Sequence, residues 1–278
     1  MAPTQSKPSL YEMVTTLTFP WQFMVVSSCY LPGTIANFIS TGNVGAFFSW
    51  DRFQSAWFSR FWDWAGPNVR TSAEAMVVPL LEGRVSNGNI ISPSDAHAPG
   101  VGGVVLEVGP GSGNWVSIFS DKYLGSAELA TSKSVSGTRS KVTRVYGVEP
   151  NPGVHPLLRK RIEEAGLEDT YEIVPVGIED LERSGRVARE SLDCIVTVLC
   201  LCSIPDPERN IRELYSYLKP GGRWYVFEHV RAYRHQGWPM RIYQGLFCSL
   251  LTYPFSPPFT FPIGTIGSHD AGCLGLLI

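Results

Sequence analysis

A glycine-rich loop that follows an apolar strand pattern constrains this chain more than any other feature. The segment "VVLEVGPGSGNWV" at residues 104–116 has strand-forming residues first and then Gly109, Gly111 and Gly113. A strand that ends in glycines and leads into a helix N-terminus forms a pocket of backbone N–H groups that side chains do not block. We therefore expect the loop to bind a small molecule, with a helix extending from it to about Leu124.

The acid within this motif separates two classes of cofactor. A dinucleotide-binding loop is expected to read GxGxxG, whereas this loop reads GxGxG and has Asn114 at the sixth position. Glu107 lies two residues before Gly109, so both face the same side of the strand. A carboxylate there repels a pyrophosphate and attracts an ammonium or sulfonium group. The motif favours S-adenosylmethionine, while a dinucleotide and a purely structural strand–turn remain open alternatives.

Apolar segments that alternate with helical patterns from residue 103 onward predict an α/β fold. Such alternation is typical of a Rossmann-like parallel sheet with helices on both faces. We expect strands at residues 104–109, 144–149, 171–176, 192–199 and 223–229. Helices are expected at residues 153–165, closed by Gly166, and at 207–218, with Asp206 as N-cap. Small and polar residues at 125–141 predict a surface loop.

Further candidate binding residues follow the later strands. Glu149 ends the second strand in "VYGVEPNP", where a carboxylate can accept hydrogen bonds from two ribose hydroxyls. In "VPVGIEDL", Ile178 can cover an adenine and Glu179 or Asp180 can meet its exocyclic amine, although a helix cap would look the same. Leu199 lies toward the carboxyl end of the fourth strand, the edge at which ligands bind in such sheets.

The N-terminal region is unusual because no charged side chain occurs between Glu12 and Asp51. Pro20, Pro32 and several glycines interrupt its apolar runs, so we expect no continuous spanning helix of ~20 residues. A re-entrant or interfacial membrane segment fits this pattern, with a soluble lid as the alternative. The following segment, "DRFQSAWFSRFWDW" at residues 51–64, predicts an amphipathic helix with an aromatic face, and a helical pattern resumes across residues 68–85.

Charge and cysteine usage exclude several classes. A net charge of −2 gives no basic stripe for nucleic acid, and the basic cluster at residues 159–161 is expected to be a solvated helix face. The six cysteines show no CxxC spacing, so we expect neither a zinc site nor a disulfide framework. The cysteines near the fourth strand are expected to be small core residues or pocket wall.

In their order, four segments resemble the class I S-adenosylmethionine-dependent methyltransferases over residues 103–245: "VLEVGPGSG", "YGVEPNP", "GIEDL" and "SLDCIVTVLCLCSIPDPERNIRELYSYLKPGGRWYVFEHV". Within that superfamily the chain is similar to the membrane-associated thiol and small-molecule methyltransferases of the endoplasmic reticulum and lipid droplets, and to their fungal relatives. The resemblance implies a cytosol-facing, membrane-associated enzyme that uses S-adenosylmethionine and methylates a hydrophobic small molecule. It also implies a set of cofactor contacts: Glu107, Gly109, Gly111 and Gly113 for the methionine end, Glu149 for the ribose, Ile178 and Glu179 for the adenine, and Leu199 near the sulfonium.

Methyl transfer from a sulfonium requires alignment and exclusion of water more than it requires catalytic side chains. A thiol acceptor largely supplies its own thiolate, whereas a hydroxyl needs a base. His229, in "FEHV" after the fifth strand, is the candidate base or substrate contact, with a structural histidine as the alternative. Two rival functions remain open: a catalytically inactive membrane-associated binding or scaffold protein, and a nicotinamide-dependent reductase.

We expect four regions: a membrane-associating segment at residues 1–50, an amphipathic helical region with a linker at 51–100, the S-adenosylmethionine-binding domain at 101–252, and a tail at 253–278. The tail is rich in proline and glycine, which fits no pair of strands. Class I enzymes continue into two further strands after the fifth. Either the sheet edge is incomplete here, or the end of the reading frame is an alternative or mis-spliced one.

Overall fold

The computed structural model describes residues 10–86, 89–95, 98–120, 123, 141–228, 242–243 and 274–276. The chain divides into two compact units, Met1–Gly66 and Pro67–Ile278. His229 lies outside the described residues, as do nearly all of the loop expected at 125–141 and most of the tail. The two units are taken in turn.

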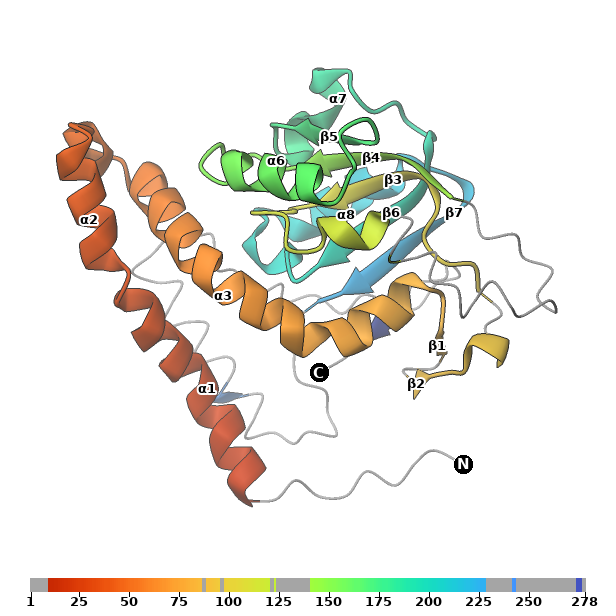
Figure 1. Cartoon of the computed structure of the whole chain (residues 1–278), viewed down its shortest axis with the longest axis horizontal. Helices are drawn as coiled ribbons and strands as arrows, with labels where there is room; N and C mark the ends of the chain where they lie inside the picture. Colours follow the sequence, from red (N-terminus) through yellow and green to blue (C-terminus); the bar gives the residue numbers. More distant parts are fainter. Residues whose placement is uncertain are drawn as a thin grey trace. The chain divides into compact units, whose positions relative to one another are not determined.

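The first unit consists of α1 (Leu10–Ser28), α2 (Leu31–Ser40), the 3₁₀ turn η1 (Val44–Phe48) and the first part of α3 (Trp50–Leu81) (Figure 1). Aromatic side chains join α1 to α3: the rings of Phe23 and Phe61 meet edge to face at 4.8 Å. The indole N–H of Trp57 donates to the carbonyl of Ser27 at 2.8 Å. The aromatic face predicted for residues 51–64 therefore packs within this unit in part.

Of the two prolines expected to interrupt the N-terminal apolar segment, Pro20 does not, whereas α1 ends at Ser28 and α2 begins at Leu31, next to Pro32. Pro20 lies inside α1, where it removes one bond from the backbone ladder of a 19-residue helix. Pro32 lies in the first turn of α2, where its missing N–H has no intrahelical partner to lose. Residues 17–40 thus form a stretch long and apolar enough to cross a membrane by length and composition, although a signal sequence would pass the same test. Only 11% of the 18 residues with the required hydropathy are buried, unlike those of a core helix.

The second unit contains a sheet with the strand order β5-β4-β3-β6-β7-β8, in which all neighbours are parallel. The strand bounds are β3 Gly103–Val108, β4 Val142–Val148, β5 Tyr171–Val174, β6 Leu192–Val198, β7 Leu218–Phe227 and β8 Leu274–Leu276. The five predicted strands are confirmed, although β7 begins earlier than expected and includes "KPGG". Within the described part of the tail, expected to hold no pair of strands, one strand is present: β8, which pairs with β7. A small hairpin of β1 (Val85–Ser86) and β2 (Asn89–Ile90) and the 3₁₀ turn η2 (Pro93–Asp95) precede the sheet.

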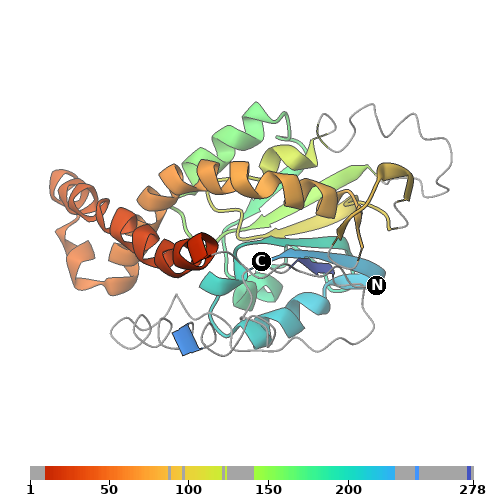
Figure 2. The same cartoon turned by 90° about the horizontal axis from the view of Figure 1, so that it is seen from below.

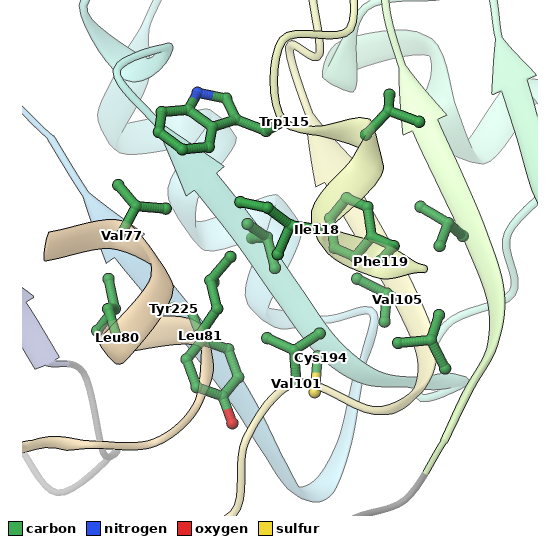
Figure 3. Close-up of a cluster of buried hydrophobic side chains, with 14 of the residues drawn as sticks. Val77, Leu80, Leu81, Val101, Val105, Trp115, Ile118, Phe119, Cys194 and Tyr225 are labelled. Atoms are coloured by element: carbon green, nitrogen blue, oxygen red, sulfur yellow. The ribbon is translucent and has the colours of Figure 1, made fainter. Parts of the chain in front are cut away.

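Helices cover both faces of this sheet, as predicted (Figure 2). The last part of α3, the 3₁₀ turn η3 (Val116–Phe119) and α6 (His155–Glu164) cover one face. Figure 3 shows part of that core, where Val77 and Leu81 of α3 and Ile118 of η3 lie over Val105 of β3 and Tyr225 of β7. The other face is covered by η4 (Ile178–Asp180), α7 (Leu181–Ser184), η5 (Leu201–Ser203) and α8 (Pro207–Tyr215).

Two local predictions fail where the backbone departs from a regular helix start. The helix expected to run from the glycine loop to Leu124 does not form over the described residues 111–120, which make turns and the four-residue η3; its start at the loop is disfavoured because three glycines at positive φ do not propagate a helix. Asp206 occupies the N-cap position of α8, but its φ of 43° places it in the left-handed region and its side chain makes no capping bond. In place of a capping bond from Asp206, the side-chain amide of Asn210 donates to the carbonyl of Pro205 at 2.6 Å.

Candidate cofactor-binding site

The glycine loop connects β3 to η3 at the carboxyl edge of the sheet. Gly109, Gly111 and Gly113 have φ values of 62°, 56° and 85°, a region that side-chain-bearing residues rarely adopt. A Cβ at Gly109 would lie 2.9 Å from Cβ of Cys200, and one at Gly113 would lie 2.8 Å from Cδ1 of Leu158. A Cβ at Gly111 would meet nothing within 4 Å. The outer glycines therefore permit close packing, and Gly111 faces open space.

Glu149, which follows β4, is held against this loop by backbone N–H groups. Its Oε2 accepts from Gly111 at 2.9 Å and its Oε1 accepts from Asn151 at 2.9 Å. The ring of His155 lies 2.9 Å from its carbonyl oxygen. Burial raises the pKa of the Glu149 carboxyl, and the two N–H bonds oppose that rise. The structure thus brings together two residues, Gly111 and Glu149, that the sequence separates by the residue 125–141 loop.

Glu107 is buried beside this pair and binds a tyrosine that the sequence analysis missed. The hydroxyl of Tyr171 on β5 donates to Oε2 of Glu107 at 2.5 Å. Burial raises the pKa of Glu107 to about 7; the Tyr171 bond lowers it and the charge of Glu149 raises it further. Tyr171 reaches Glu107 across Gly147, where any Cβ would collide with the hydroxyl. A glycine inside a strand often marks such a close approach, so Gly147 in "VYGVEP" could have indicated the contact from the sequence.

A third buried carboxylate, Glu228, follows β7 at the same edge. It accepts hydrogen bonds from the backbone N–H groups of Cys200 at 3.1 Å and Leu201 at 3.2 Å, and the Cys200 thiol lies 3.4 Å away. Burial raises the pKa of Glu228 to about 7. Leu199 precedes this contact with a φ of 53°, and its N–H donates to the carbonyl of Phe227 at 2.8 Å. Glu228 therefore fixes the segment that follows β6.

The remaining predicted residues lie in different surroundings. Ile178 is buried in the core cluster on the α7 and α8 face, whereas Glu179 is exposed and folds its carboxylate over Gly177. Burial raises the pKa of the Cys200 thiol well above its usual range, which fits the expected role of that cysteine as pocket wall or core.

One member of the basic cluster was assigned incorrectly from the sequence. Arg159 and Lys160 are exposed, as expected. Arg161 instead donates to the carbonyl of Ser112 at 3.0 Å and to Oδ1 of Asn114 at 2.7 Å. It points toward the glycine loop because position 161 lies one helical turn from Leu158, which packs on Gly113.

These residues fit S-adenosylmethionine, judged by their chemistry. The loop leaves space at Gly111, whose N–H donates to the buried carboxylate of Glu149, and the buried Glu107 is close enough to Glu149 to feel its charge. Burial raises the pKa values of both acids, and the charge of Glu149 raises the pKa of Glu107 further, so a bound cation would stabilise the ionised forms. A carboxylate pair with free lone pairs also suits an ammonium group and ribose hydroxyls as donors.

Comparison with known proteins places the chain in a family. Residues 92–252 match the family model described as a methyltransferase domain. The human thiol S-methyltransferase TMT1A is 39% identical over 90 residues, which cover 32% of this chain and 35% of that protein. A phosphatidylethanolamine N-methyltransferase of Cereibacter sphaeroides is 25% identical over 134 residues, covering 48% of this chain and 54% of that protein. A solved S-adenosylmethionine-dependent methyltransferase from Aquifex aeolicus is 17% identical, covers 54% of this chain and 70% of that one, and gives a TM-score of 0.34.

The chain belongs to the methyltransferase domain family, whose model matches more than half of its length. The predicted class, a class I S-adenosylmethionine-dependent methyltransferase, is confirmed, as is S-adenosylmethionine as the cofactor. The chain spans 35% of the length of the human thiol methyltransferase that it matches. Its acceptor is therefore a matter for proposal.

Proposed function

We propose that this protein transfers the methyl group of S-adenosylmethionine to a thiol or hydroxyl of a hydrophobic small molecule. The observation that carries the proposal is the open space at Gly111 beside the buried carboxylate of Glu149, with a second buried carboxylate, Glu107, near Glu149. A thiol is the preferred acceptor, because relatives that match about a third of this chain are thiol S-methyltransferases.

In this proposal the chain's residues bind and orient the cofactor. Glu107 pairs with the ammonium of the methionine end, Glu149 accepts from the ribose hydroxyls, and Gly111 leaves the backbone accessible. Gly109 and Gly113 hold the loop in shape. Ile178 and Glu179 would lie on the adenine side, and Leu199 would border the reacting centre. When bound, S-adenosylmethionine supplies an electrophilic methyl group on a sulfonium.

The acceptor determines whether the protein must also move a proton. A thiol ionises readily enough that alignment and exclusion of water suffice. A hydroxyl requires a base, and we assign that role to His229, which follows the buried Glu228 in the sequence. A His229→Gln variant would then lose turnover of a phenol while keeping turnover of a thiol.

We also propose that the N-terminal unit associates with a membrane and that the catalytic domain faces the cytosol, at the endoplasmic reticulum or lipid droplets. Large apolar side chains are exposed along α1 and α2, among them Phe19, Trp21, Val25 and Ile39. Carbonate extraction of cell membranes should leave the protein in the membrane fraction. A Val25→Asp, Ile39→Asp double variant should be released from the membrane fraction. Asn37→Asp is the control, because it places a charge at an exposed polar position. Its retention should fall between that of the wild type and that of the double variant. Full release of the wild type would contradict insertion.

Calorimetric titration with S-adenosylmethionine and its demethylated product tests cofactor use directly. A panel of apolar thiols, phenols and amines, read by mass spectrometry, then tests the acceptor. We expect binding of both cofactor forms and methylation of the thiols. Binding without turnover of any acceptor would favour an inactive scaffold, and binding of NADH in place of S-adenosylmethionine would contradict the proposal altogether.

A further inference from the structure

Residues 114–120, which follow the last loop glycine, do not form a regular α-helix. Side chains hold this segment in place instead. Only turn-type backbone bonds span it, such as Gly113 N–H to the Pro110 carbonyl at 2.9 Å and Val116 N–H to the Gly113 carbonyl at 3.3 Å. A regular helix would fix this loop through its own ladder of hydrogen bonds. Here the short η3 offers four residues.

Arg161 of α6 holds the segment from one side. Its Nη1 donates to the Ser112 carbonyl at 3.0 Å, to the Ser112 hydroxyl at 3.1 Å and to Oδ1 of Asn114 at 2.7 Å. Hydrogen bonds from a guanidinium are shorter and stronger than those between neutral groups. The exposed Arg159 lies on the same helix and gives a matched control.

Arg70, in the part of α3 that belongs to the second unit, holds the same segment from the other side. Its Nη1 donates to the Asn114 carbonyl at 2.6 Å, and its Nη2 donates to the Ser117 hydroxyl at 2.9 Å. The guanidinium also lies 5.8 Å from the centre of the Trp115 ring, within range of a cation–π contact. Figure 3 shows Trp115 at the end of the core cluster that η3 shares with α3.

Two guanidinium groups therefore meet at Asn114: one binds its side chain and the other its main chain. We infer that Arg70 and Arg161 are positioning residues that keep the loop from Gly111 to Ser117 in the shape required for S-adenosylmethionine. This inference rests on the proposed cofactor site. It gives Asn114, at the position where a dinucleotide-binding loop has glycine, a defined role as the shared acceptor.

The test compares full-length variants that each remove one part of this clamp. Arg161→Met and Arg70→Met remove the donors, and Asn114→Ala removes the Oδ1 acceptor without a change of charge. Arg159→Met is the control for loss of a positive charge on α6. Calorimetry measures the Kd for S-adenosylmethionine, and hydrogen exchange measures protection of the 111–117 amides in the free protein. Each measurement is made well below the melting temperature of the variant concerned.

We expect the Kd to rise at least tenfold for each arginine variant and at least fivefold for Asn114→Ala, with faster exchange at residues 111–117 and no change for Arg159→Met. The effects of Arg161→Met and Asn114→Ala should not add, because both remove the same bond. Arg161→Lys should recover part of the affinity. A rise in Kd below these values in a variant that folds, or unchanged hydrogen exchange at residues 111–117, would overturn the inference. If an arginine variant does not fold, the Kd and the exchange of Asn114→Ala test the inference alone. Failure of the wild type to bind S-adenosylmethionine would refute the proposed function itself, so the two failures are distinguishable.

Discussion

The hydroxyl of Tyr171 reaches Oε2 of Glu107 at 2.5 Å by crossing the intervening strand at Gly147. One hydrogen bond therefore connects β5 to β3 beneath the glycine loop, and the residue between them has no side chain. The bond gives Glu107 a fixed orientation in a buried position. Burial raises the pKa of the Glu107 carboxyl to about 7, although the Tyr171 bond lowers it. Near pH 7 the carboxyl is therefore a mixture of its protonated and ionised forms.

Cofactor affinity should depend on pH through Glu107. A cation binds the ionised carboxylate, so the Kd for S-adenosylmethionine should fall as pH rises toward about 7, by up to ~10-fold per pH unit, and level off above it. Calorimetry between pH 5.5 and 8.5 measures this. A Glu107→Gln variant should bind at least ~10-fold more weakly at pH 8 and lose most of the dependence. A wild-type Kd that stays constant over this range would show that Glu107 does not pair with the cofactor.

The stability of the free protein should show the opposite trend. The folded pKa values of Glu107 and Glu228 are each raised from 4.5 to about 7, so between these values the folded state binds more protons than the unfolded state. The free energy of unfolding should therefore fall as pH rises from about 4.5 to about 7, by up to ~3 kcal/mol for each group. Urea denaturation of the wild type and of Glu107→Gln across this range tests the sign. As pH rises, the free energy of unfolding of Glu107→Gln should fall by less than that of the wild type. An equal fall in both proteins would argue against a raised pKa of Glu107.

Tyr171→Phe should raise the pKa of Glu107 further, because the hydrogen bond that favours the ionised form is lost. We expect the affinity for S-adenosylmethionine to fall several-fold at pH 7 and to recover toward the wild-type value at pH 9, where the carboxyl ionises regardless. Tyr146→Phe is the control, since Tyr146 lies on β4 and contributes to the opposite core cluster. A loss of affinity that is the same at both pH values would indicate a general packing defect instead.

The residues that the sequence identified share one property: their pattern is local. Alternation of apolar segments predicted the five strands, and Gly166, with a φ of 67°, closes α6 as expected. Glu107 and Glu149 were candidates because each stands directly beside a strand end. Contacts that depend on the register of distant segments were not accessible in this way. Tyr171 could be paired with Glu107 only once β5, β4 and β3 were known to lie side by side.

Two of the failures also come from contacts between distant segments, and a third is local. Arg161 looked like part of a solvated basic face because its partner, Asn114, is distant in sequence. The helix expected after Gly113 was inferred from the usual strand–loop–helix unit, but side chains from α3 and α6 hold this segment instead. Pro20 was counted as a helix breaker, yet a single missing N–H does not outweigh the propensity of the long apolar run around it.

Gly113 should tolerate alanine far less well than Gly166 does. Both have positive φ values, 85° and 67°, so alanine strains the backbone by about 1 kcal/mol at either position. At Gly113 the added Cβ would also lie 2.8 Å from Cδ1 of Leu158, whereas at Gly166 nothing lies within 4 Å. We expect Gly113→Ala to lower the free energy of unfolding by about 2–4 kcal/mol and Gly166→Ala by about 1 kcal/mol, measured by urea denaturation. Because α6 would be pushed from the loop, Gly113→Ala should also weaken S-adenosylmethionine binding, and Gly166→Ala should not. Equal losses of stability would mean that α6 does not pack on Gly113 as described.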